Sequence, residues 1–266
     1  MNINKLFFTL FSVSLLCLLS CQNQTHSTLK IAASSTPHAE LLEQIKPTLN
    51  LEGIQLEIIV IDDYQIPNRA LNDREVDANF FQHLPFLELQ NKELSCELIS
   101  FAKVHLEPMG LYSKKVKQLT EIPNNGAVVI PSDPTNQSRA LILLEKTGLI
   151  SLKNRSLTIT KLDIDENPKK LQIFEIDAAV LPRSLEDAHL AAIPANFALQ
   201  ASLSPITDAL ILEDQQSLFT NILAIRPEDQ ERKDLKQLKI ALTSPEIRNH
   251  IEQTYRGAII PAFENN

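Results

Sequence analysis

Arg139 is the residue of this sequence whose position most directly suggests a binding role. It follows the segment Pro131–Ser138, in which two prolines predict a turn between a strand and a helix. Asn136 or Ser138 could cap that helix, whose N-terminus offers free N–H groups and the positive end of a dipole to an anion. A basic side chain is disfavoured in the first turn of a helix, where we place Arg139. We therefore predict that its guanidinium grips a ligand carboxylate; an ordinary surface arginine is the alternative.

Three phenylalanines and a histidine lie close together around a predicted strand–helix junction. Phe80, Phe81 and Phe86 flank His83, although the whole chain has only 11 phenylalanines, 3 tyrosines and no tryptophan. In an extended segment Phe80 and Phe81 point to opposite faces, so both cannot belong to one side of an ordinary core. Ligands bind beyond the carboxyl ends of strands in open α/β sheets. The segment predicts an apolar pocket wall with His83 as a polar group beside it, and plain core packing of all three rings is the alternative.

Two asparagines next to predicted strands could supply amides to the same site. Asn196 comes just after the strand expected at 191–194, and Asn221 stands before the strand expected at 222–225. An amide offers both an acceptor oxygen and a donor nitrogen. A zwitterion needs acceptors around its ammonium group as well as a cation for its carboxylate, so these amides suit a small amino acid. Taken alone, each asparagine is more simply explained as a turn residue.

The elements that must position these residues alternate along the chain between apolar, β-rich segments and segments of helical periodicity. Strands are expected at residues 29–33, 56–61, 78–81, 98–105, 109–113, 127–130, 171–176, 191–194 and 222–225. Helices are expected at residues 37–49, 68–73, 84–94, 138–147, 227–242 and 245–255. This alternation predicts an α/β fold in which helices cover mostly parallel sheets.

The N-terminal segment predicts an exported protein with a lipid anchor. Phe7–Leu19 is almost wholly apolar but shorter than the roughly 20 residues that span a bilayer, which is typical of a signal peptide. Ser20 directly precedes Cys21, an arrangement that resembles the bacterial lipobox, in which the cysteine is acylated and becomes the mature N-terminus. We expect a signal peptide at 1–20 and a flexible, lipid-anchored tether at 21–28. An ordinary cleaved signal peptide is the alternative and would also place the protein outside the cytoplasm.

Composition and spacing argue against several other classes of function. The formal net charge is −8 and no basic block occurs, so nucleic acid is not an expected partner. The chain has 5 glycines, and no two are close enough for a phosphate-binding loop, a dinucleotide fingerprint or a nucleophile elbow. Its 6 histidines include no pair four residues apart and no cysteine partners, so no metal site is expected. We expect no catalysis and no cofactor, although a Ser–His pair formed only in space stays open.

Many short strings of the sequence resemble a single family, in one order. They are Pro37-His38-Ala39-Glu40, Asp63-Tyr64, Pro67-Asn68, Ala70-Leu71-Asn72-Asp73, Asp77-Ala78-Asn79-Phe80-Phe81-Gln82-His83, Pro108-Met109-Gly110-Leu111-Tyr112-Ser113-Lys114-Lys115, Arg139-Ala140-Leu141, Glu166-Asn167-Pro168-Lys169, Leu181-Pro182-Arg183 and Tyr255-Arg256-Gly257-Ala258-Ile259-Ile260-Pro261-Ala262-Phe263. From Leu29 to Phe263 the chain resembles the methionine-binding lipoproteins of bacterial ABC importers, the NlpA family. The resemblance implies a fold like that of type II periplasmic binding proteins, with two α/β lobes, two crossovers and a ligand cleft between the lobes. It implies lobe 1 at 29–109 and 222–266 and lobe 2 at 110–221.

The resemblance also implies roles for individual side chains. The positions that match those around the methionine side chain are Tyr64, Phe80, Phe81, His83 and Phe86. Arg139 matches the arginine that grips the α-carboxylate, and the amides at the polar end of the cleft match Asn136, Asn196 and Asn221. Phe86 and Phe197 stand where the family usually has tyrosine, so at Phe86 one hydroxyl hydrogen bond is lost.

The function implied is that of the substrate-binding lipoprotein of an ABC importer. Its expected partners are methionine, as the L- or also the D-enantiomer, a membrane permease with its ATPase, and the membrane through the lipid anchor. The protein is expected to be a monomer. One alternative is a surface lipoprotein that acts as an adhesin or antigen. Another is a binding protein for a different small amino acid or a methionine-containing peptide, and an enzyme acting on an amino-acid derivative is the third.

Overall fold

The computed structural model describes residues 27–214 and 218–264. The predicted signal peptide, Cys21 and nearly all of the predicted tether lie outside these residues. The end of the expected tether differs from the prediction, because Ser27 and Thr28 already belong to a strand and pair with Ile54 and Gln55. Within the described ranges, no helix is both long and apolar enough to cross a membrane.

The first sheet mixes parallel and antiparallel strands. Its order is β13-β4-β12-β3-β1-β2. The strands are β1 (Ser27–Ala33), β2 (Ile54–Val60), β3 (Ala78–His83), β4 (Ile99–Leu106), β12 (Thr220–Ile225) and β13 (Ile260–Pro261). β1 is parallel to β2 and β3, whereas β12 is antiparallel to β3 and β4. The prediction of mostly parallel sheets is therefore only half right. Parallel neighbours need a crossover connection, usually a helix, whereas the chain reaches β12 from the second sheet.

Helices cover both faces of the first sheet. They are α2 (Glu40–Leu51), α3 (Ile66–Asn72), α4 (Leu84–Leu94), α9 (Lys233–Leu242) and α10 (Pro245–Tyr255), with the helical turns η2 (Ser35–Ala39) and η6 (Pro227–Asp229). Side chains alternate between the faces: Ile31 packs in the core with α2, α9 and α10, whereas Ala32 packs in the core with α3 and α4. α2 buries Leu41, Ile45 and Leu49, whose spacing of four residues places them on one face.

The second sheet has the order β11-β5-β10-β6-β9. Its strands are β5 (Gly110–Tyr112), β6 (Ala127–Pro131), β9 (Gln172–Ile176), β10 (Leu190–Ile193) and β11 (Ala209–Leu212). The helices and turns around it are α5 (Pro134–Lys146), α6 (Leu181–Ser184), α7 (Ala195–Gln200), α8 (Pro205–Asp208), η3 (Leu119–Glu121), η4 (Lys161–Asp163) and η5 (Ala178–Val180). A separate two-stranded sheet joins β7 (Ser151–Leu152) to β8 (Ile164–Glu166).

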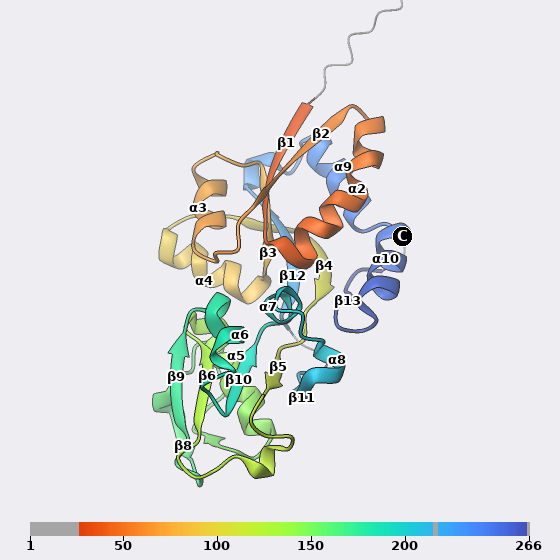
Figure 1. Cartoon of the computed structure of the whole chain (residues 1–266). Helices are drawn as coiled ribbons and strands as arrows, with labels where there is room; N and C mark the ends of the chain where they lie inside the picture. Colours follow the sequence, from red (N-terminus) through yellow and green to blue (C-terminus); the bar gives the residue numbers. More distant parts are fainter. Residues whose placement is uncertain (1–26, 215–217, 265–266) are drawn as a thin grey trace, which may run out of the picture.

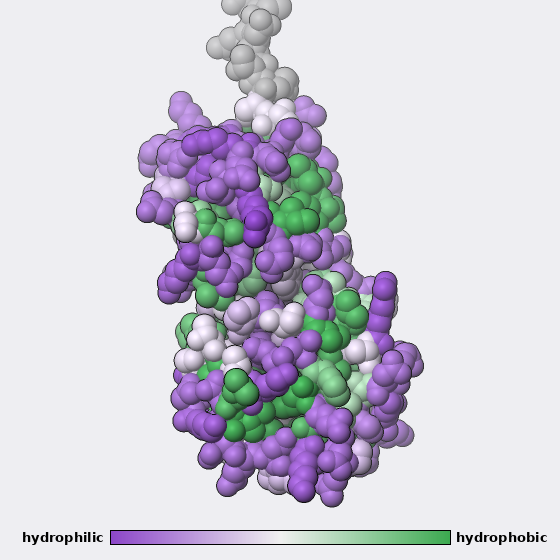
Figure 2. All heavy atoms as spheres, turned by 90° about the vertical axis from the view of Figure 1, so that its left-hand side faces the viewer, coloured by the Kyte–Doolittle hydropathy of each residue, from purple (hydrophilic) through white to green (hydrophobic). Residues whose placement is uncertain are grey.

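The two sheets form the cores of two α/β lobes, one above the other in Figure 1. The chain passes from the first sheet to the second between β4 and β5 and returns between β11 and β12. Figure 2 shows mostly hydrophilic side chains on one face of the molecule, with separate hydrophobic patches on both halves. This architecture brings residues from distant parts of the sequence together where the lobes meet.

The expected helices at 84–94 and 245–255 have the predicted bounds, and the other four differ. The segment expected as one helix at 37–49 is η2 followed by α2, so Pro37 lies in η2 and α2 begins at Glu40, and the helix expected at 68–73 is α3, Ile66–Asn72. The helix expected at 138–147 begins at Pro134, because the Asp133 side chain caps it by accepting from the Asn136 N–H. Neither Asn136 nor Ser138 is the cap. The helix expected at 227–242 is divided into η6 and α9, because Arg232 is extended. The short elements α7, α8 and β11 carried too little periodicity to be predicted.

Candidate functional site

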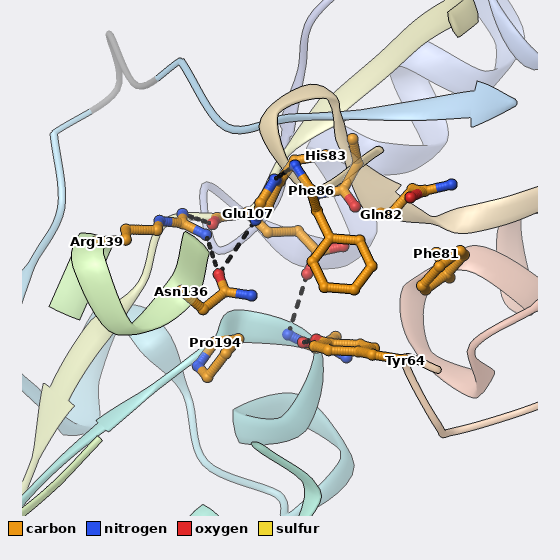
Figure 3. Close-up of a pocket in the computed structure, with 11 residues that line it drawn as sticks. Tyr64, Phe81, Gln82, His83, Phe86, Glu107, Asn136, Arg139 and Pro194 are labelled. Atoms are coloured by element: carbon orange, nitrogen blue, oxygen red, sulfur yellow. Dashed lines mark hydrogen bonds between the residues drawn. The ribbon is translucent and has the colours of Figure 1, made fainter. Parts of the chain in front are cut away.

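A cavity lies between the two lobes at the ends of β3, β10 and β12 (Figure 3). Its lining residues are Tyr64, Phe81, Gln82, His83, Phe86, Glu107, Asn136, Arg139, Pro194, Asn196 and Asn221. Eight of the nine ligand-binding residues predicted from the sequence are thus brought together, although the most distant of them are separated by most of the chain. Phe80 is the exception.

Three aromatic rings form one side of the cavity, which we call the apolar wall: Tyr64, Phe81 and Phe86. Tyr64 follows β2, Phe81 lies in β3, and Phe86 lies in the first turn of α4. The ring centroids are 6.0 Å apart for Tyr64 and Phe81, 5.8 Å for Tyr64 and Phe86, and 5.9 Å for Phe81 and Phe86. These separations suit tilted and edge-to-face aromatic packing, so the rings hold one another in place around an apolar space.

Phe80 faces away from this wall. It is fully buried in the core of the first sheet, where its ring contacts those of His38 at 4.6 Å and His105 at 5.4 Å between centroids. The cause is the alternation of side chains along β3, which sends Phe81 to one face and Phe80 to the other. The structure therefore separates the two phenylalanines, and Phe80 supports the site only from behind.

Arg139 lies in the second turn of α5, and not in the first turn where we expected it, because the helix begins earlier. Its side chain is 3% exposed. The guanidinium donates from Nε to Glu213 Oε2 at 2.8 Å, from Nη2 to the same oxygen, and from Nη2 to the Glu107 carbonyl at 2.5 Å. It also stacks on the Phe219 ring at 4.6 Å from the centroid. This cation is therefore fixed in orientation at the edge of the cavity.

Glu107 places a buried carboxylate in the same cavity. Its Oε1 lies 2.7 Å from His105 Nε2 and 3.3 Å from His38 Nε2, and its Oε2 accepts from the Asn196 N–H at 3.2 Å. Burial raises the pKa of this carboxyl group, an effect that His38 and Arg139 oppose. Burial also lowers the pKa of His38 to about 4 and that of His105 to about 3. The histidines are therefore neutral near pH 7.

The cluster of His38, His105 and Glu107 has the residue types of a metal site, and its candidate ligand atoms lie within 4.8 Å of one another. Its contacts fit a hydrogen-bonded carboxylate better. Ser34 Oγ lies 2.6 Å from His38 Nδ1, so the neutral His38 is free to donate from Nε2 toward Glu107 and toward Asn221 Oδ1 at 3.1 Å. Within the described part of the chain His105 Nδ1 has no hydrogen-bond partner, whereas a ligating histidine normally has its second nitrogen anchored. We interpret the cluster as two neutral donors that orient one carboxylate.

The three predicted amides lie at the polar end of the cavity, which we define as Glu107, Asn136, Arg139, Asn196 and Asn221. Asn136 Oδ1 lies 3.2 Å from His83 Nε2, a hydrogen bond that joins the two lobes. Asn196 Oδ1 accepts from the Tyr64 hydroxyl at 3.0 Å. The Asn196 Nδ2 group is buried and has no hydrogen-bond partner among the residues that the structure describes, so it has a donor to offer a ligand.

His83 connects the wall to the polar end. Its Nδ1 accepts from the Phe86 N–H at 3.2 Å, which caps α4, and its Nε2 reaches Asn136. Burial, with a further effect of Arg139, lowers the pKa of His83 to about 3, so the ring is neutral near pH 7. His83 therefore acts as a structural link and hydrogen-bonding group.

Sequence reasoning missed Glu107, Gln82 and Pro194 among the lining residues, as well as His38 and His105 behind them. One signal was available for Glu107. It directly follows a strand, in the segment that connects the lobes, and a carboxylate at such a place is costly to bury unless it has partners or a ligand. Gln82 is explained by a network of buried amides with Asn68 and Asn79.

The family of the chain follows from comparison with known proteins. The sequence pattern of the NlpA lipoprotein family matches residues 29–263. The chain belongs to the NlpA lipoprotein family. Members are substrate-binding proteins of transporters, and the two-lobe architecture described above is that of the family.

One curated relative and two solved structures locate this NlpA-family protein more closely. It is 37% identical over 240 residues to the methionine-binding lipoprotein MetQ of Bacillus subtilis, and the match covers 88% of each chain. A nutrient binding protein of Burkholderia cenocepacia, solved bound to methionine, is 38% identical with a TM-score of 0.86, covering 88% of this chain and 100% of that one. A periplasmic substrate-binding protein of an ABC transporter from Coxiella burnetii is 44% identical with a TM-score of 0.84, again covering 88% and 100%.

Proposed function

We propose that this protein binds methionine between its lobes and delivers it to a membrane permease of an ABC importer. The observation that carries the proposal is that the Arg139 cation and the Glu107 carboxylate both line one end of a cavity whose other side is aromatic. An amino acid has one cation and one anion on a single carbon, so a buried cation and a buried carboxylate facing one cavity suit it. The methionine bound to the Burkholderia cenocepacia relative supports the choice of ligand.

At the polar end, each group of the zwitterion has a candidate partner. We propose that Arg139 Nη1 donates to the α-carboxylate together with Asn196 Nδ2, for which the described residues supply no partner. We propose that the ammonium group donates to Glu107 and to amide oxygens such as that of Asn221. Two neutral histidines hold the Glu107 carboxylate, so the ammonium group would supply the positive charge that this buried anion lacks.

At the apolar wall, Tyr64, Phe81 and Phe86 would enclose the thioether side chain. A thioether is polarizable and gains about 0.3–1.5 kcal/mol from each favourable contact with an aromatic ring. The wall should therefore favour methionine over leucine modestly. Phe86 offers no hydroxyl, so the hydrogen bond that a tyrosine would provide there is absent.

Binding would stabilise the closed arrangement of the lobes. We propose that lobe 1 comprises residues 29–109 and 222–266 and lobe 2 residues 110–221. The strand content of the two sheets supports this division apart from its edges, because β1 begins at Ser27 and β12 at Thr220, both in the first sheet. The His83–Asn136 and Tyr64–Asn196 hydrogen bonds cross between the halves and would form as the cleft closes.

We further propose that the mature protein is a monomer anchored through acylated Cys21 and that the closed form docks on a permease with its ATPase. The tether would keep the protein near the permease and so raise its local concentration there. We propose no enzymatic step and no cofactor.

Calorimetry on protein freed of co-purified ligand tests the proposal. We expect L-methionine to bind tightly and L-leucine to bind more weakly. The affinity for D-methionine is measured in the same way and compared with that for L-methionine. Native mass spectrometry of untreated protein should show a mass increment equal to methionine. An empty cleft with no methionine binding would favour the alternative of a surface lipoprotein with a vestigial site, and a different increment would identify another amino acid or a small peptide.

A further inference from the structure

Glu213 connects the arginine of the site to both segments that join the lobes. It follows β11, on the segment that returns the chain to the first sheet. Its Oε2 accepts from Arg139 Nε at 2.8 Å and from Arg139 Nη2, and the Met109 N–H lies 3.3 Å from the same oxygen. The Glu213 N–H in turn donates to the Met109 carbonyl at 2.8 Å. Met109 belongs to the outgoing connection, so one carboxylate holds both connections and Arg139.

The geometry shows which edge of the guanidinium Glu213 occupies. It takes Nε and Nη2, and Nη2 also reaches the Glu107 carbonyl. Nη1 is left with a distant contact of 3.5 Å to Asn136 Oδ1, on the cavity side. Glu213 itself does not line the cavity, whereas Arg139 does. A carboxylate that competed with the ligand would occupy the cavity side, and Glu213 lies on the opposite one.

We propose that Glu213 is a positioning residue that sets the affinity for the ligand carboxylate by holding Arg139 and tying it to the two connections between the lobes. The proposal rests on the function proposed above, in which Arg139 binds that carboxylate. An arginine side chain has many rotamers, and ordering it before the ligand arrives removes that cost from binding. Glu213 also offsets the charge of a guanidinium that is 3% exposed, so Arg139 stays in place in the empty site.

The position of Glu213 gives the proposal a mechanical consequence. Lobe closure requires rearrangement of the connecting segments, and the Glu213–Met109 contacts hold these segments side by side. A ligand carboxylate bound at Arg139 Nη1 therefore joins a hydrogen-bond network that already includes the two segments connecting the lobes. Carboxylate binding and lobe closure should be coupled through Glu213. The affinity of ligands without a carboxylate should therefore not depend on Glu213.

The test compares Glu213→Gln with Asp214→Asn. Both variants remove one negative charge from adjacent residues, but Asp214 is largely exposed and pairs with Lys146 at 2.8 Å, whereas Glu213 is mostly buried and pairs with Arg139. Affinities for L-methionine and for L-methioninol, which has no carboxylate, are measured by calorimetry. We expect Glu213→Gln to weaken L-methionine binding by roughly tenfold or more and to change L-methioninol binding by less than about twofold. Asp214→Asn should change neither.

Several outcomes would overturn the proposal. Unchanged L-methionine affinity in Glu213→Gln, with a loss in Arg139→Ala, would remove the role of Glu213 and leave the proposed function intact. Tighter L-methionine binding by Glu213→Gln would show that Glu213 competes with the ligand carboxylate for Arg139. An equal loss of affinity for L-methionine and L-methioninol would show that its role is merely structural. Unchanged affinity in Arg139→Ala would overturn the proposed function as well. If Glu213→Gln does not fold, Glu213→Asp, which keeps the charge on a shorter side chain, should show the same selective loss to a smaller degree.

Discussion

The apolar wall and the polar end of the cavity are assembled in different ways. Phe81 and Phe86 of the wall stand at one strand–helix junction, and only Tyr64 joins them from a neighbouring connection. The polar end draws on four separate parts of the chain, and the hydrogen bond from His38 to Asn221 spans 183 residues of sequence. The wall is local and held by ring packing, whereas the polar end is held by a hydrogen-bond network that includes contacts between the lobes, such as that of His83 with Asn136.

This difference suggests that the apolar wall and the polar end divide two functions in ligand binding between them. Ring contacts are individually weak and tolerate substitution, so the wall should tune which side chain is preferred. Buried charges are costly unless they are paired, so the polar end should decide whether an amino acid binds at all. Four predictions test this division, from the largest expected effect to the smallest.

Arg139→Ala should abolish measurable methionine binding. Removing the cation leaves the ligand carboxylate buried without its partner, which costs roughly 2–5 kcal/mol of binding free energy. Calorimetry with L-methionine measures the loss. Arg183→Ala, which removes an exposed arginine of α6, is the matched control and should bind normally. Normal binding by Arg139→Ala would place the carboxylate elsewhere.

Glu107→Gln should weaken binding of the ammonium group while keeping the shape of the side chain. A hydrogen bond to a charged group contributes about 1.5–3 kcal/mol, so we expect a loss of that order for L-methionine. The comparison ligand is 4-(methylthio)butanoate, which lacks the amino group and should bind the variant no worse than the original protein. An equal loss for both ligands would show that Glu107 only maintains the structure.

Binding should weaken in acid. Burial raises the pKa of Glu107, and a bound ammonium group would lower it again, so the ionised carboxylate is the form that binds better. Affinity should therefore be full above that pKa and fall as the pH decreases through it, by up to about 1.4 kcal/mol per pH unit. His38 and His105 stay neutral in the folded protein until about pH 4 and 3. Calorimetry from pH 7.5 to pH 5 measures the slope, which Glu107→Gln should flatten.

Phe81→Leu should mainly change ligand preference. It removes one ring from the wall, so the preference for L-methionine over L-leucine should fall by about 0.3–1.5 kcal/mol, measured as the ratio of the two dissociation constants. Phe80→Leu is the matched control on the opposite face of β3. It should lower the unfolding free energy and leave the preference unchanged, because Phe80 packs in the core. A changed preference in Phe80→Leu would contradict this assignment of the two faces.

The sequence predicted most elements of the fold because their causes are local. The periodicity and flanking residues of 84–94 and 245–255 are sufficient to define α4 and α10. The start of α5 was misplaced because Asp133, Asn136 and Ser138 are all good caps, and the choice among them depends on how β6 ends. The two sheets contain antiparallel strands where parallel ones were expected, since the direction of β12 and of β5 depends on how the chain crosses between lobes.

For the site, the sequence by itself determined the apolar character of the wall and the absence of any phosphate-binding glycine loop, whereas its placement of Arg139 in the first turn of a helix was wrong. Each of these depends on residue types and short spacings. Only the tertiary structure decided that Phe81 and not Phe80 faces the cavity, that Glu107 is buried between His38 and His105, and that Glu213 holds Arg139. Alternation along a strand says that two neighbours face apart but not which face is the cleft, and a buried ion pair is defined by groups that meet only after the whole chain has folded.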